Sequence, residues 1–189
     1  MRVIIVGAGE VGYNTAKFLT LEGIDVVVID RDGEKLRRIS EELDIATIEG
    51  EGSDPSVFKE AGARNADILV AVTNSDETNM IACLLGKALF GVKRRIARIR
   101  NPDYFFNKEL LGKNYLDIDP AINPELETAN AILRILEIPF ATEVIEFEEE
   151  RVVVTGLKIP AKSRVINRDL KYLRSIINKN FIIGIIKKW

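Results

Sequence analysis

Short runs of apolar residues recur along the chain, with segments long enough for a helix between them. The runs begin 19 to 28 residues apart, which is the spacing of β–α units rather than of hairpins. They are rich in valine and isoleucine and mostly do not alternate with polar residues, a pattern typical of strands covered by helices on both faces. The runs predict six strands, at Val3–Val6, Val26–Ile29, Ile45–Ile48, Ile68–Val72, Ile96–Ile99 and Tyr115–Ile118.

Helix-start signals fall between these runs. Asp54–Pro55 is typical of a helix cap followed by proline at the first helical position, and Ser75–Glu77 caps the next helix with acidic groups in its first turn. Asn123–Leu136 begins with a similar signal and carries an apolar stripe. Strands and helices together predict an α/β fold, a doubly wound Rossmann-type domain with a six-stranded parallel sheet and a crossover helix.

The chain divides by pattern into three parts. Residues 1–122 form the predicted Rossmann domain, residues 123–141 the crossover helix and linker, and residues 142–189 a small α+β domain. The small domain is too short to be stable alone, so we expect it to pack on its neighbour or on a second copy. Its predicted elements are strands at Glu143–Phe147 and Arg151–Lys158 joined by the acidic turn Glu148–Glu150, a helix at Leu170–Ile177 and a closing strand at Phe181–Ile186.

Composition narrows the function. The net charge of −2 offers no basic surface for nucleic acid, so we expect no nucleic-acid partner. No signal sequence and no run approaching the roughly 20 apolar residues of a membrane helix is evident, which predicts a cytoplasmic protein. The single cysteine, Cys83, lies in an apolar run and is predicted to be buried in a helix. One cysteine excludes an intramolecular disulfide and favours a reducing compartment.

The chain contains no histidine. This removes the commonest general acid/base, the Ser-His and Cys-His nucleophile pairs and most transition-metal sites. We therefore expect no catalytic residues and no metal site, although lysine, tyrosine and carboxylates leave an enzyme open.

A glycine-rich segment, Gly7–Gly12, matches G-x-G-x-x-G directly after the first strand and at the start of a helix. Gly7 permits the tight turn, Gly9 lets a pyrophosphate approach the backbone, and Gly12 lets helix and strand pack closely. The start of the helix offers free N–H groups to phosphates. The alternative is a glycine-rich turn without a ligand.

Asp30 ends the second strand, where a carboxylate accepts hydrogen bonds from the ribose hydroxyls of an adenine nucleotide. A carboxylate there would repel a 2′-phosphate, which favours NAD or an adenine nucleotide over NADP, although Arg31 could tolerate the extra phosphate. The alternative for Asp30 is a solvated turn residue. Glu51–Asp54 and Thr73–Asn74 follow the third and fourth strands, where such sheets bind ligands. Asp54 could equally be a helix cap, and Thr73 and Asn74 could equally turn the chain.

Arg98 stands inside the predicted fifth strand. A buried arginine needs an anionic partner. A nucleotide phosphate held in bidentate fashion would supply one. A nearby carboxylate in a structural ion pair would supply one equally well, and both interpretations stay open.

These segments together resemble the regulatory subunits of Trk-type potassium uptake systems, the TrkA family, whose domains are called KTN or RCK. The likeness is dense over residues 1–136 and looser beyond, where LKIPAKS is similar to the family's second domain. Ordinary dehydrogenases share the glycine motif but not the later segments. The matching segments are RVIIVGAGEVG, VIDRD, EGEGSD, AVTNSDETN and ARIRNPDY.

The resemblance implies a non-catalytic protein that binds NAD(H) or ATP/ADP. It implies a homodimer formed through the crossover helix, assembly of dimers into a ring, and a membrane potassium transporter or channel subunit as partner. The protein would then lie at the inner face of the plasma membrane. Carried over by position, the ligand contacts would be Gly7, Ala8, Gly9, Glu10, Val11, Asp30, Thr73, Asn74 and Arg98.

Two departures and two rival functions stay open. The family's second domain normally runs beyond the apolar strand Phe181–Ile186, so the resemblance predicts a shortened domain here. Glu51 stands where relatives often carry aspartate.

One rival function is a small NAD-dependent oxidoreductase, for which the chain offers little material for a substrate domain. The other is a redox-sensing DNA-binding repressor, for which no basic helix-turn-helix is evident.

Overall fold

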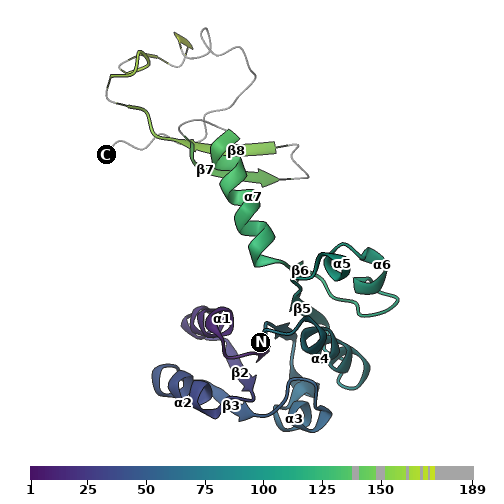
Figure 1. Cartoon of the computed structure of the whole chain (residues 1–189). Helices are drawn as coiled ribbons and strands as arrows, with labels where there is room; N and C mark the ends of the chain where they lie inside the picture. Colours follow the sequence, from purple (N-terminus) through teal and green to yellow (C-terminus); the bar gives the residue numbers. More distant parts are fainter. Residues whose placement is uncertain (138–140, 148–151, 161, 167, 170, 173–189) are drawn as a thin grey trace. The chain divides into compact units, whose positions relative to one another are not determined.

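The computed structural model describes residues 1–137, 141–147, 152–160, 162–166, 168–169 and 171–172. The chain divides into two compact units, Met1–Ala129 and Asn130–Trp189. Figure 1 shows the first unit as a sheet with helices on both of its faces. The division into residues 1–122, 123–141 and 142–189 stays a prediction.

The first unit is built on a six-stranded, all-parallel sheet in the order β3-β2-β1-β4-β5-β6. This is the strand order of the doubly wound Rossmann fold, in which the chain reverses its direction of progress across the sheet between β1 and β4. The predicted fold class is confirmed. The strands are β1 (Arg2–Val6), β2 (Asp25–Asp30), β3 (Ala46–Glu49), β4 (Ile68–Ala71), β5 (Arg94–Arg98) and β6 (Ala121–Ile122).

Two apolar cores lie on the two faces of this sheet. Helices α1 (Glu10–Leu21) and α2 (Gly33–Glu42) cover one face, where Ala16 and Leu36 pack against alternate valines and isoleucines of β1 and β2. Helices α3 (Pro55–Glu60) and α4 (Asp76–Ala88) cover the other. Strands buried on both faces need the continuous apolar runs that the sequence shows. A 3-10 turn (Ala63–Asn65), α5 (Pro102–Phe105), α6 (Lys108–Leu111) and α7 (Pro124–Glu137) complete the helices of the described residues.

The prediction of a sixth strand at Tyr115–Ile118 is wrong, because β6 is the two-residue strand Ala121–Ile122. Leu116 and Ile118 are buried in the core beside α4, but they reach it from a loop. Between them Asp117 takes a positive φ of 53°, which interrupts any extended run. Its carboxylate lies 2.7 Å from the guanidinium of buried Arg95, so this ion pair fastens the loop to β5.

Cys83 is fully buried in α4, as the sequence predicted. Burial raises the pKa of its thiol to about 12. Because the thiolate is the reactive form of cysteine, Cys83 carries no thiol chemistry at neutral pH in the folded protein.

In the second unit the two predicted strands are confirmed as an antiparallel pair, β7 (Ala141–Phe147) and β8 (Val152–Leu157). Ile145 lies opposite Val154 in their register. The predicted acidic turn at 148–150 and the strand at 181–186 lie outside the described residues, as does the predicted helix at 170–177 except for residues 171–172. Across the described ranges, no helix combines the length and the hydropathy needed to cross a bilayer.

Candidate functional site

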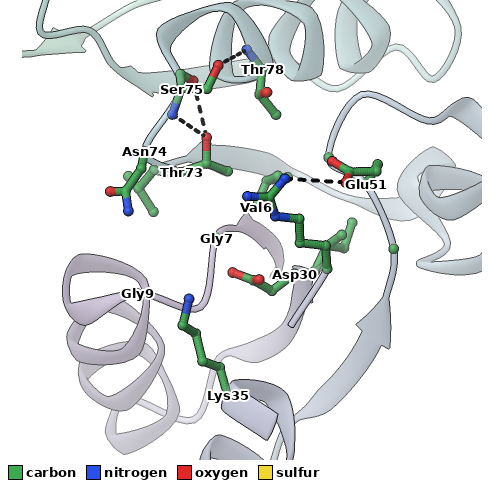
Figure 2. A pocket seen from close by; sticks show the side chains of 15 residues that line it. Val6, Gly7, Gly9, Asp30, Lys35, Glu51, Thr73, Asn74, Ser75 and Thr78 are labelled. Carbon is green, nitrogen blue, oxygen red and sulfur yellow. Dashed lines mark hydrogen bonds and ion pairs between the residues drawn. The ribbon is translucent and has the colours of Figure 1, made fainter. Parts of the chain in front are cut away.

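A cleft opens at the carboxyl ends of the central strands, on either side of the point where the strand order reverses. Open α/β sheets bind their ligands at this position. Figure 2 shows side chains from the loops after β1, β2, β3 and β4 converging on it. The residues that line the cleft are Val6, Gly7, Gly9, Ile29, Asp30, Arg31, Lys35, Gly50, Glu51, Gly52, Val72, Thr73, Asn74, Ser75 and Thr78.

The three glycines of the first turn have three different environments. Gly7 has φ +113°, and a Cβ there would lie 2.9 Å from the backbone nitrogen of Thr73. A Cβ on Gly12 would overlap the backbone oxygen of Gly7. A Cβ on Gly9 would meet nothing within 4 Å. Gly7 and Gly12 therefore serve the fold, whereas Gly9 leaves open space at the wall of the cleft.

Helix α1 begins at this turn without a side-chain cap among the described residues. Gly9 occupies the cap position and lines the cleft, so α1 begins at the wall of the cleft, and the first N–H groups of the helix have no intrahelical partner. Such groups, together with the helix dipole, bind anions. The neighbouring predicted contacts Ala8, Glu10 and Val11 are not among the residues that line the cleft, so their role stays a prediction.

The carboxylate of Asp30 is held in place by two backbone amides. The N–H of Ala8 donates to Oδ2 at 2.6 Å, and the N–H of Asp32 donates to Oδ1 at 2.9 Å. Asp30 thus joins the end of β2 to the glycine turn. Each carboxylate oxygen has two lone pairs, so both oxygens keep accepting capacity, and Asp30 lines the cleft.

Thr73 and Asn74 both line the cleft, but the hydroxyl of Thr73 is already engaged. It lies 2.7 Å from Oδ1 of Asn79 and 3.2 Å from the backbone nitrogen of Ser75. The backbone N–H of Thr73 also donates to Oδ1 of Asn79, at 2.9 Å. The amide nitrogen of Asn79 donates to the carbonyl oxygens of Thr73 and Arg98. Asn79 is fully buried and fixes the rim of the cleft to the end of β5.

Arg98 does not line the cleft. Its guanidinium forms an ion pair with Glu125 at 2.8 Å, at the start of α7, and reaches Oδ1 of Asn74 at 3.4 Å. The pKa of the Glu125 carboxyl is lowered, first by a hydrogen bond from its own backbone N–H and then by Arg98. The structural ion pair therefore exists as the sequence allowed, while a phosphate contact of Arg98 stays a prediction. Nε of Arg98 is buried without a hydrogen-bond partner among the described residues.

The loop after β3 contributes Gly50, Glu51 and Gly52 to the lining of the cleft. A Cβ on Gly52 would overlap the side chain of Val6, so only glycine fits there. Glu51 pairs with Arg31 at 3.7 Å. Asp54 is a helix cap, because its Oδ1 accepts from the backbone N–H of Ser56 at 2.8 Å, and it does not line the cleft.

Sequence reasoning missed two residues that the structure makes prominent. Lys35 lines the cleft from the first turn of α2, and Asn79 holds the cleft's rim together. Lys35 could have been found from its position in the sequence, since it lies five residues after Asp30 and three after the helix cap Asp32. For Asn79 the signal was an asparagine on the apolar side of a helix, where a polar residue needs buried partners.

The arrangement can bind a ligand that combines phosphate with vicinal hydroxyls. The start of α1, whose first N–H groups have no intrahelical partner, lies at the wall of the cleft, and the carboxylate of Asp30, which keeps accepting capacity, lines the cleft as well. Within the described ranges, no group of Cys, Asp and Glu side chains is placed to hold a metal ion.

The family model and the relatives that match this chain carry the same family name. Residues 3–124 match the family model described as the TrkA-N domain. The chain is 39% identical over 175 residues to the "Trk system potassium uptake protein TrkA" of Vibrio alginolyticus, covering 92% of this chain and 38% of that protein. It is 40% identical over 174 residues to the protein of the same name from Halomonas elongata, covering 92% and 38%. The chain thus spans less than two fifths of the length of these relatives.

Solved structures share the fold at low sequence identity. The TrkA-N domain of the inner membrane protein ybaL from Escherichia coli aligns with a TM-score of 0.62 and 19% identity, over 71% of this chain and 96% of that one. The GsuK channel bound to NAD aligns with a TM-score of 0.60 and 18% identity, over 78% and 25%. GsuK bound to ADP aligns with a TM-score of 0.57 and 20% identity, over 75% and 34%.

Proposed function

The chain belongs to the TrkA-N domain family, and from this premise we propose that it is a nucleotide-binding regulatory subunit of a potassium uptake system. Its relatives carry the name of the Trk potassium uptake system. In this proposal it acts at the cytoplasmic face of the membrane, on a potassium transporter or channel subunit, and catalyses no reaction of its own.

The observation that carries the proposal is the cleft between the glycine turn and Asp30. Open space at Gly9 accommodates phosphate beside the uncapped start of α1. Asp30 lies where it can accept from ribose hydroxyls. The ligand is NAD(H) or ATP/ADP, which is supported by the related fold of GsuK, solved with NAD and with ADP. The predicted contacts are Gly7–Val11, Asp30, Thr73, Asn74 and Arg98.

Regulation requires that the nucleotide bind two states of the assembly with different affinity. The contact that could transmit the difference is the pair of Arg98 and Glu125. Arg98 also reaches Asn74 at the cleft, and Glu125 stands in the first turn of α7. A ligand that draws on Arg98 would therefore change what holds the start of α7.

Asp30→Ala is expected to weaken nucleotide binding by about 10- to 100-fold, the range for losing hydrogen bonds to a charged group. The change removes the acceptor for ribose hydroxyls and frees the N–H of Ala8 in the glycine turn. Calorimetric titration with NADH, NAD, ATP and ADP measures the effect. The control is Asp44→Ala, an exposed aspartate in the loop that leads into the amino end of β3, whereas the cleft lies at the carboxyl ends of the strands.

Two results would count against this account. Equal loss in both aspartate variants would remove Asp30 from the site. A wild-type chain without affinity for any of the four nucleotides would end the proposed function. Catalytic consumption of NADH with oxo-acid substrates would favour the rival function of a small NAD-dependent oxidoreductase.

The homodimer in this proposal forms through α7. Its apolar side chains Ile132, Leu133, Ile135 and Leu136 are all exposed, Leu136 by 72%. Exposed apolar side chains gathered on one helix mark an interaction surface.

Leu136→Glu is therefore expected to convert the dimer to monomer, because it places a charge in the apolar contact. Sedimentation or light scattering gives the mass. Leu89→Glu, at another exposed leucine that follows α4, is the matched control and should leave the mass unchanged. An unaltered mass in Leu136→Glu would remove α7 from the interface.

A further inference from the structure

The cleft holds four charged side chains among its described lining residues. Asp30 and Glu51 are acidic, and Arg31 and Lys35 are basic. Arg31 is paired with Glu51 at 3.7 Å, on the loops that follow β2 and β3. The two acidic and two basic side chains cancel, so the cleft as a whole carries no net positive charge to offset the negative charge of a phosphate-bearing ligand. Lys35 is the remaining cation of that lining set.

Lys35 is placed to meet such a charge. It stands in the first turn of α2, with its side chain 49% exposed, and Figure 2 shows it extending toward Gly9, where α1 begins. Its ammonium lies 3.4 Å from Oδ2 of Asp32. The other oxygen of Asp32 accepts from the backbone N–H groups of Glu34 and Lys35, so the carboxylate caps α2 independently of the ammonium.

We propose that Lys35 is a phosphate-binding, specificity-determining residue of this cleft. When the ligand binds, the ammonium of Lys35 moves from the carboxylate of Asp32 to the phosphate held at the start of α1. This rests on the proposed nucleotide-binding function. The start of a helix supplies only about half an elementary charge, whereas an ammonium supplies a full one on a flexible stem. Lys35 therefore makes the cleft select phosphorylated ligands over the bare nucleoside.

The competing role for Lys35 is that of a surface partner for Asp32. Exposed i,i+3 pairs contribute little to stability, and a lysine with that role alone would leave ligand binding unchanged. The two roles therefore differ in what removal of the ammonium does to a phosphorylated ligand compared with an unphosphorylated one.

The test compares ADP with adenosine on the wild-type chain, Lys35→Met and Lys93→Met. Lys93 is an exposed lysine directly before β5, at the amino-end edge of the sheet, so its removal changes the net charge equally. Calorimetric titration measures the affinity for ADP, and the affinity for adenosine is measured by its displacement of bound ADP. We expect Lys35→Met to bind ADP about tenfold more weakly, as for the loss of a charge-assisted hydrogen bond. Adenosine should stay within about twofold, and Lys93→Met should match the wild type for both.

Lys35→Arg keeps the charge and should restore most of the affinity for ADP. Each other pattern overturns the proposal. Wild-type affinity for ADP in Lys35→Met assigns Lys35 to the Asp32 pair and leaves the proposed function intact. Equal loss for adenosine and ADP means that Lys35 shapes the nucleoside part of the cleft. A wild-type chain that binds neither ADP, ATP, NAD nor NADH refutes the proposed function together with Lys35.

Discussion

Gly12→Ala is expected to lower the free energy of unfolding by about 3 kcal/mol, the upper part of the range for overpacking. The new methyl would overlap the backbone oxygen of Gly7, and neither partner can move freely. Gly12 is buried in the first turn of α1, and Gly7 is fixed by the hydrogen bond from its N–H to the carbonyl oxygen of Ile29. Relief would need α1 to move away from β1, which would separate Ala16 from the core beneath it.

Gly9→Ala is the matched control, because the chemical change is the same three positions earlier. The Cβ would meet nothing within 4 Å, and φ of −72° is ordinary for alanine. Its stability should therefore stay within about 1 kcal/mol of the wild type, since the loss at the cap position and the entropic gain nearly offset each other. Urea unfolding without nucleotide, followed by circular dichroism, compares the two variants. Equal stability of both would mean that α1 and the glycine turn are not packed as described.

The fold was predictable because the central strands are buried on both faces. Apolar runs such as Val26–Ile29 with helix-length segments between them favour strands of a parallel sheet, and the glycines fit the close contacts of the turn after β1. The sixth strand failed for a physical reason. Leu116 and Ile118 are as buried as strand residues, and burial alone does not distinguish a strand from a loop that fills the core. Contacts between distant parts of the chain hold the loop, among them the ion pair of Asp117 with Arg95 and the hydrogen bonds from Lys87 to the carbonyl oxygens of Lys113 and Tyr115.

The site was predictable only where local sequence determines it. Asp30 could be assigned from its distance to Gly7, because β1 and β2 are adjacent and parallel. Arg98 could not be assigned to one partner, since both a ligand phosphate and a carboxylate satisfy a guanidinium. The carboxylate, Glu125, stands 27 positions away. Lys35 escaped notice because a lysine on a short amphipathic helix is ordinarily a solvated residue.

Asn79 joins the two parts of the site that local sequence leaves separate, the loop after β4 and the end of β5. Its Oδ1 accepts from the backbone N–H and the hydroxyl of Thr73, and its amide donates to the carbonyl oxygens of Thr73 and Arg98 at 3.2 and 2.8 Å. Water cannot readily replace Asn79 as the partner of these groups, because its side chain is fully buried.

Asn79→Ala is therefore expected to lower the free energy of unfolding by about 3 kcal/mol, since each buried group left without a partner costs about 1–3 kcal/mol. The control is Asn65→Ala, an exposed asparagine in the 3-10 turn before β4, which should change stability by less than about 0.5 kcal/mol. Urea unfolding measures both. Nucleotide affinity should fall with stability only in Asn79→Ala, because Thr73 and Asn74 at the rim of the cleft lose their fixed position. A loss below about 1 kcal/mol would show that the rim of the cleft is held by Ser75 and Arg100, which also bond to that loop.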